Sequence, residues 1–156
     1  ADIQQTFLDS SSSILFQGWV THKQVLLERE NRKLPFEDES FDIVVSFYAL
    51  EHISPLEPAL FEIRRVLKAG GLFVGAIPAE GGLAWGLGRL LTSRRWLKKN
   101  TGIDPDKIIC WEHPNFADTI LAELDKKFMK QRLFFWPFRI PLIDINLVIS
   151  FIYKVD

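Results

Sequence analysis

The sequence has little cysteine, little histidine and almost no net charge, and each shortage excludes a class of protein. Cys110 is the only cysteine among 156 residues, so an internal disulfide framework and a site of several cysteine ligands are excluded. The three histidines show no ligand spacing, and we therefore expect no metal. A formal net charge of -1 gives no basis for general nucleic-acid binding, so we expect no nucleic-acid partner.

The sequence also lacks an uninterrupted apolar run of membrane-spanning length. Its most apolar region, residues 133–153, contains two prolines, Arg139 and Asp144, whereas a spanning helix needs about 20 mostly uncharged residues. The Phe, Ile and Val content of this region favours two strands around a proline-containing loop. Because no signal peptide is visible and the single cysteine fits a reducing compartment, we expect a cytoplasmic protein.

No initiator methionine is present, since the sequence begins Ala1-Asp2-Ile3 and its only methionine is Met129. A length of 156 residues, with 47% hydrophobic residues, suffices for one domain with its own core. We expect residues 1–156 to form a single domain whose N-terminal part is incomplete.

The sequence does contain a strand–helix–strand pattern. Residues 41–47, FDIVVSF, are nearly all apolar, as in a strand buried on both faces of a parallel sheet. A Ser-Pro pair at 54–55 and helical spacing over 56–67 predict a helix, which we expect the glycines at 70–71 to end. Residues 72–77 read as the next strand. This unit predicts an α/β fold with an open, mostly parallel sheet and helices on both faces.

The later sequence predicts an insertion and then more sheet. We expect one or two short helices within residues 79–115, a helix over 116–128, and strands near 129–135 and 145–154. The basic stretch within the insertion, residues 89–99, allows three interpretations. It could be a solvated helix face, a lid over an anionic substrate, or a contact with a membrane surface. We favour a solvated lid over membrane contact.

Two segments resemble a known family. LPFEDESFDIVVSFYALEHI at residues 34–53 and ALFEIRRVLKAGGLFVGAIP at residues 59–78 resemble the central and later part of class I S-adenosylmethionine-dependent methyltransferases that act on small molecules. The resemblance covers residues 2–78 well and continues loosely to the end of the chain. It implies a Rossmann-like sheet with an antiparallel terminal strand. It also implies methyl transfer from S-adenosylmethionine to a small-molecule acceptor, with S-adenosylhomocysteine as the product.

The resemblance implies a set of cofactor contacts. Asp2 would hold the two ribose hydroxyls, because one carboxylate can accept a hydrogen bond from each of them. Glu30 and Asn31 would lie at the adenine. The implied cofactor-binding residues are Asp2, Ile3, Glu30, Asn31, Phe47, Tyr48 and Leu50.

The resemblance also suggests residues on the acceptor side. His52 lies just after the first predicted strand and is a candidate general base, although Glu51 and His52 could instead be a helix-cap pair. Trp111 and His113 are implied acceptor contacts, because insertions at this place shape the acceptor pocket in the family. The aromatic residues and arginines of the insertion suggest a partly apolar or anionic acceptor.

One expected feature of the family is missing. Its glycine-rich cofactor turn would precede Asp2, and the glycines within residues 81–88 follow a different strand. The sheet as given therefore lacks its first strand. Two alternatives to an active methyltransferase stay open: a truncated or degenerate domain that binds partners as a scaffold, and a nicotinamide-dependent Rossmann enzyme.

Overall fold

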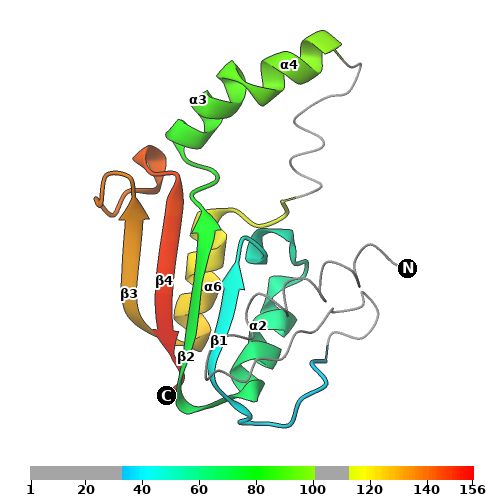
Figure 1. Ribbon diagram of the computed structural model, residues 1–156, viewed down its shortest axis with the longest axis vertical. Coiled ribbons are helices and arrows are strands. Elements are labelled where there is room, and N and C mark those ends of the chain that lie inside the picture. Colours follow the sequence, from blue (N-terminus) through cyan, green and yellow to red (C-terminus); the bar gives the residue numbers. More distant parts are fainter. Residues whose placement is uncertain (1–32, 101–112) are drawn as a thin grey trace, which may run out of the picture. The chain divides into compact units, whose positions relative to one another are not determined.

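The computed structural model describes residues 33–100 and 113–156. The chain divides into two compact units, residues 1–34 and 35–156, and every element described below belongs to the second unit (Figure 1). The elements are β1 (Phe41–Phe47), η1 (Leu50–His52), α2 (Leu56–Val66), β2 (Leu67–Pro78), α3 (Leu83–Leu91), α4 (Ser93–Asn100), α6 (Ala117–Lys127), β3 (Met129–Trp136), η2 (Ile143–Ile145) and β4 (Val148–Lys154).

Four strands form one sheet in the order β1-β2-β4-β3. Strand β1 pairs in parallel with β2, whereas β4 runs antiparallel to both of its neighbours, β2 and β3. The predicted α/β class and the antiparallel terminal strand are therefore confirmed. Among the described strands, β1 and β2 form the only parallel pair.

The chain passes from α2 into β2 earlier than the sequence predicts. The helix ends at Val66, so the expectation that the glycines at 70–71 end it is wrong. Val66 is 1% exposed and Leu67 is 2% exposed, and burying both side chains favours an extended chain from Leu67 onward. Gly70 instead lies inside the strand with φ of 76°, a backbone region that favours glycine.

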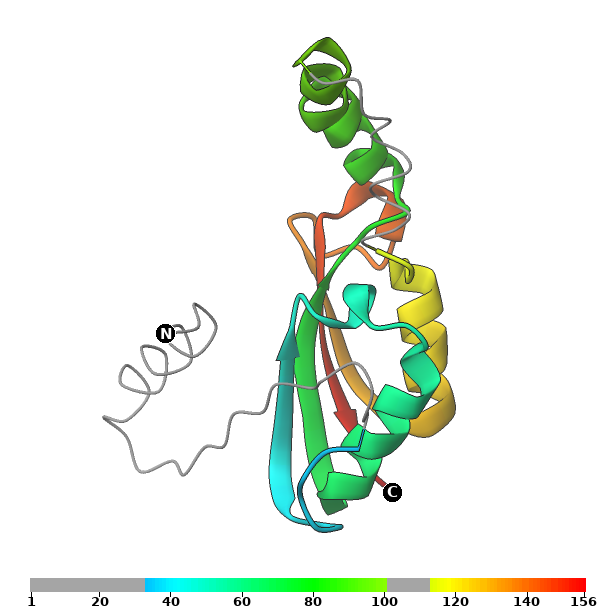
Figure 2. The same ribbon diagram turned by 90° about the vertical axis from the view of Figure 1, so that its right-hand side faces the viewer.

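Helices α2 and α6 lie on the same face of the sheet (Figure 2). Leu60 of α2 and Leu124 of α6 are fully buried against Phe73 and Phe151 of the sheet. The opposite face of β1 is open in the described part of the chain, since Val45 is 60% exposed. The prediction that this strand is buried on both faces is therefore wrong, because no described helix covers its second face.

The described part of the predicted insertion contains two short helices, α3 and α4, in line with the expectation of one or two. The first turn of helix α3 is hydrogen-bonded to the connection between β3 and β4. The backbone N–H of Leu83 donates to Oδ1 of Asp144 at 3.3 Å, and Nε1 of Trp85 donates to the Leu147 carbonyl at 2.7 Å. None of the described helices is both long and apolar enough to cross a membrane.

The connection between β3 and β4 is shaped by one buried side chain. Asn146 is 0% exposed, and its Nδ2 donates to the carbonyls of Ile140 and Leu142 at 2.8 and 2.7 Å. Its Oδ1 accepts from the backbone N–H of Phe138 at 3.1 Å. A single amide therefore satisfies three backbone groups of this loop, which holds the loop in one conformation.

Candidate functional site

The parallel strands β1 and β2 end at the same edge of the sheet, where open α/β sheets bind their ligands. Phe47 ends β1 and is 60% exposed, and Tyr48 follows it at 51% exposed. Tyr48 has φ of 50°, which is uncommon for a residue with a side chain. Its backbone N–H still donates to the Ala76 carbonyl at 2.9 Å. Two predicted cofactor residues thus present aromatic surface at the expected edge.

Leu50 is the third predicted cofactor residue in the described part of the chain, and its side chain has a packing role. It is 1% exposed and belongs to the core cluster with Leu56 and Leu60 of α2. A cofactor contact of Leu50 stays a prediction, and the structure directs its side chain into the core rather than to the open edge.

Glu51 is a buried acid that the sequence did not mark as a site residue. It is 3% exposed, and within the described residues its Oε2 has no hydrogen-bond partner. The helix-cap alternative does not hold for it, because η1 is capped at Ala49 without a side-chain hydrogen bond. Burying a carboxylate oxygen without a partner costs free energy. Such an unpaired carboxylate oxygen beside the open edge is a candidate for binding a ligand.

Glu80 forms a second buried acidic position, just beyond the end of β2. Its carboxylate, 3% exposed, pairs with Nη2 of Arg89 from α3 and with Nδ1 of His113 from the segment before α6. The Arg89 guanidinium also lies 5.4 Å from the ring centroid of Trp85. Sequence reasoning missed Glu80, although its place two residues after Pro78, just beyond the carboxyl end of a predicted strand, was a usable signal.

The structure brings two predicted site residues together. The rings of His52 and His113 meet edge to face, with centroids 4.4 Å apart and an interplanar angle of 77°. Asn115 fixes this arrangement, because its Nδ2 donates to the carbonyls of Leu50 and Ile53 at 3.0 and 2.6 Å. The candidate general base and the candidate acceptor contact therefore belong to one cluster beside Glu51 and Glu80.

The remaining predicted site residues lie outside the described part of the chain and stay predictions. They are Asp2, Ile3, Glu30, Asn31 and Trp111. Within residues 33–100 and 113–156, no three His, Cys, Asp or Glu side chains are placed to hold a metal ion.

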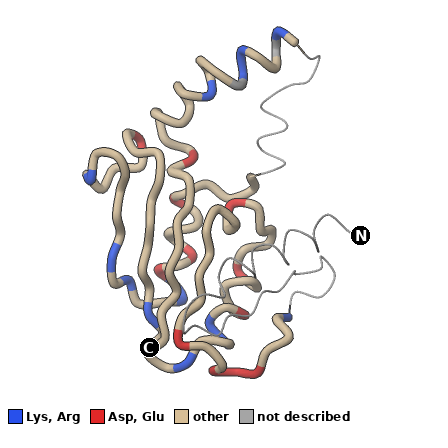
Figure 3. Tube along the Cα trace, in the orientation of Figure 1, with Lys and Arg blue, Asp and Glu red and all other residues tan. Residues whose placement is uncertain are grey.

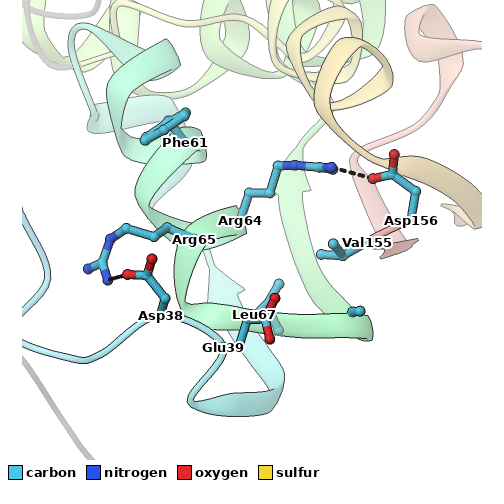
Figure 4. A pocket seen from close by; sticks show the side chains of 9 residues that line it. Asp38, Glu39, Phe61, Arg64, Arg65, Leu67, Val155 and Asp156 are labelled. Carbon is cyan, nitrogen blue, oxygen red and sulfur yellow. Dashed lines mark hydrogen bonds and ion pairs between the residues drawn. The ribbon is translucent and has the colours of Figure 1, made fainter.

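A hollow of about 310 Å³ lies at the opposite, amino end of the parallel strands (Figure 4). Both of its arginines are already paired, since Arg64 contacts Asp156 and Arg65 contacts Asp38 at 2.6 Å. Hydrogen bonds from Arg65 to Glu62 and Asp38 raise the pKa of its guanidinium, so it stays charged. We therefore place the candidate site at the carboxyl edge and not in this hollow.

Comparison with known proteins points to the same family as the motifs. Residues 2–75 match a family model described as a methyltransferase domain. The chain is 43% identical over 54 residues to the sterol 24-C-methyltransferase ERG6B of Gibberella zeae, a match that covers 35% of this chain and 14% of that protein. It is 36% identical over 77 residues to the human mitochondrial arginine-hydroxylase NDUFAF5, which covers 49% of this chain and 21% of that protein.

The fold also has solved counterparts. A crystal structure of a SAM-dependent methyltransferase from Methanosarcina mazei aligns with a TM-score of 0.57 at 20% identity, over 99% of this chain and 78% of that one. At this identity the likeness concerns the fold. The domain match bears out the predicted resemblance to class I S-adenosylmethionine-dependent methyltransferases, and the solved structure bears out the fold. The matched segments span only a small part of the two relatives described above.

Proposed function

We propose that this protein transfers a methyl group from S-adenosylmethionine to a small-molecule acceptor. The match of residues 2–75 to a methyltransferase domain carries the proposal. The relative named as a sterol methyltransferase supports a small and partly apolar acceptor. A cytoplasmic location, and an anionic group on the acceptor, remain parts of the proposal that rest on the sequence alone.

The described residues fit such a cofactor at one end of its site. When bound, S-adenosylmethionine supplies a methyl group activated by a sulfonium. Phe47 and Tyr48 would hold the cofactor with the aromatic surface they expose beyond β1. Asp2 and Glu30 are proposed to bind the adenosine, with Ile3 and Asn31 beside them. The protein mainly aligns acceptor and methyl group, which lowers the barrier without requiring a covalent step on the enzyme.

The cluster of His52 and His113 can accept a proton from an acceptor that must be deprotonated for methyl transfer. Glu80 accepts a hydrogen bond from Nδ1 of His113 and so fixes that ring, and the His113 ring packs against His52. We propose that His52, held in this way, removes the proton as the methyl group is transferred. His113, with Trp111, would contact the acceptor. Glu51 lies next to His52 and offers an unpaired oxygen to a donor group of the ligand.

The arginine-hydroxylase relative limits what this segment alone can specify. A matching segment occurs in a protein named for hydroxylation, so the shared segment does not set the reaction by itself. The scaffold alternative has no observation in its favour among the comparisons or the described residues. The nicotinamide alternative predicts a different ligand and is open to direct test.

Calorimetric titration with S-adenosylhomocysteine tests the proposal. We expect binding, and we expect the Phe47→Ala/Tyr48→Ala variant to weaken it by about tenfold or more, since stacked aromatic surface contributes about 1 kcal/mol or more per ring. Phe61→Ala is the matched control, because Phe61 is equally exposed at 60% but lies on α2. Failure to bind S-adenosylhomocysteine, or preference for a nicotinamide dinucleotide, would overturn the proposal.

A transfer assay then tests the role of His52. With radiolabelled S-adenosylmethionine and a set of sterol acceptors, we expect His52→Asn to lower kcat while S-adenosylhomocysteine binding stays unchanged. A kcat equal to that of the unmodified protein would remove His52 from the chemistry without affecting the proposed cofactor.

A further inference from the structure

Large apolar side chains are exposed together at the carboxyl end of β2. We call this surface the apolar–basic tip. It comprises α3, α4 and the connection between β3 and β4, and its exposed apolar residues are Leu83, Leu87, Leu90, Leu91, Trp96, Trp136, Phe138, Ile140 and Leu142. Their exposed fractions run from 48% for Ile140 to 75% for Leu83. So many exposed apolar side chains at one end of a unit mark an interaction surface.

The parts of the tip are joined to one another. Pro78, which ends β2, pairs with Val148, and Val148 pairs with Trp136 at the end of β3. Helix α3 follows β2 and is hydrogen-bonded to the side chain of Asp144 in η2. The exposed residues of α3 and those of the β3–β4 connection are therefore placed at one end of the sheet (Figure 1).

The charged residues of the tip are mostly basic. Residues 81–100 and 129–142 contain no Asp or Glu, and Asp144 is the acidic residue of the β3–β4 connection. Arg95 and Lys99 are exposed on α4, and Arg139 is exposed at the turn after β3. Figure 3 shows basic residues along α4 and at that turn. The tip therefore combines exposed leucine, phenylalanine and tryptophan side chains with positive charge.

We propose that the apolar–basic tip binds the surface of an anionic lipid bilayer. Leucine and aromatic side chains enter the boundary between headgroups and acyl chains, and tryptophan is enriched at that depth. Arg and Lys pair with anionic headgroups. A second copy of the chain fits less well, because two basic tips would repel each other. This proposal goes beyond the proposed methyl transfer and does not depend on it. Its consequence is that the carboxyl edge of β1 and β2 would face the bilayer.

Flotation of the full chain with vesicles tests the proposal. The probes are phosphatidylcholine vesicles with and without phosphatidylserine. We expect binding to the anionic vesicles to exceed binding to the neutral ones by about tenfold or more and to fall as salt rises. Two variants separate the contributions: Leu87→Ser/Leu91→Ser removes apolar contact, and Arg95→Gln/Lys99→Gln removes charge.

Each variant has a matched control at the opposite end of the sheet. Phe61→Ser removes an equally exposed apolar side chain from α2, and Lys68→Gln/Lys126→Gln removes two exposed charges. We expect the serine variant at the tip to lose binding to both kinds of vesicle. The Arg95→Gln/Lys99→Gln variant should lose only the preference for phosphatidylserine, and the controls should bind as the unmodified chain does.

Three results would overturn the proposal. The first is no binding of the unmodified chain to anionic vesicles. The second is an equal loss of binding in the tip variants and in their controls. The third is a light-scattering mass of two chains in solution that falls to one chain in the Leu87→Ser/Leu91→Ser variant without any vesicle binding, which would make a second copy the occupant of the tip. Circular dichroism of every variant checks that the fold is retained.

Discussion

Two glutamates at the carboxyl edge of the sheet are equally buried but have different surroundings. Glu51 and Glu80 are each 3% exposed. Glu80 pairs with Arg89 and His113, whereas Oε2 of Glu51 has no partner among the described residues. We therefore expect the Glu80 carboxylate to stabilise the folded state and the Glu51 carboxylate to destabilise it. A ligand with a hydrogen-bond donor could supply the partner that Glu51 lacks.

Replacing each acid by methionine tests this difference. Glu51→Met keeps the length of the side chain and removes an unpaired oxygen, so we expect the free energy of unfolding to rise by about 1 kcal/mol. Glu80→Met leaves Arg89 and His113 without their carboxylate, and we expect a fall of about 2 kcal/mol. Urea unfolding measures both. A fall of similar size in both variants would mean that Glu51 is paired in solution.

Tyr153 carries a pH dependence that the structure explains. The side chain is 0% exposed, and its phenol donates to Oδ1 of Asp125 at 2.6 Å. Burial, reinforced by this hydrogen bond, raises the pKa of Tyr153 above its ordinary value of 10.0. The folded state therefore keeps a proton that the unfolded state loses above about pH 10. Stability is fully present below pH 10 and falls as the pH rises above it.

Tyr153→Phe should reveal this titration. At pH 7 we expect the variant to lose about 1 kcal/mol of unfolding free energy, because the hydrogen bond to Asp125 is absent. Above pH 10 the unmodified protein should lose stability faster than the variant, so the difference between them should narrow. Unfolding measured at pH 7, 9 and 11 checks the prediction. A difference that stays constant with pH would contradict the assigned pKa shift.

At the scale of elements, the close approach of β1, β2 and β4 depends on one glycine. A Cβ added to Gly75 would lie 2.2 Å from the Ser46 carbonyl oxygen and 2.5 Å from Cζ of Phe151. Gly86 in α3 is a contrasting position, since a Cβ there meets nothing within 4 Å. The same substitution should therefore have opposite effects at the two sites.

We expect Gly75→Ala to lower the free energy of unfolding by about 3 kcal/mol or more, since backbone and a packed ring must move. Gly86→Ala should raise the stability of α3 by up to about 1 kcal/mol, because alanine is the better helix former. Thermal unfolding followed by circular dichroism measures both. Tolerance of alanine at Gly75 would show that the strands are further apart than the structure has them.

The sequence predicted the type of each described α-helix and strand well, their ends less well, and the short helices η1 and η2 not at all. The helical spacing of Ile120 and Leu124 predicted α6 to within one residue at each end, because an amphipathic stripe reports the buried face directly. The boundary between α2 and β2 was missed, since glycine ends helices often and nothing local shows that Leu67 is needed in the core. The salt-bridged cluster at Glu80 was missed because Arg89 and His113 meet it only through tertiary structure.

At the scale of the whole molecule, an apolar run predicts a strand but does not show whether both faces of that strand are covered. The run from Phe41 to Phe47 predicted a strand, and β1 has those bounds. Its side chains nevertheless face two environments. Val44 packs against the core under α2 and α6, whereas Val45 points to a face that no described helix covers. Composition alone cannot distinguish a covered face from an open one, because both carry apolar residues here.

Substitution of these neighbouring valines by lysine tests which face is covered. Val44→Lys should lower the free energy of unfolding by about 3 kcal/mol or prevent folding, since a charge would enter the core. Val45→Lys should change stability by less than about 0.5 kcal/mol, because the side chain is 60% exposed and a lysine there stays in water. Urea unfolding compares the two, and circular dichroism shows whether Val44→Lys folds. A large loss in Val45→Lys would mean that another part of the protein covers this face in solution.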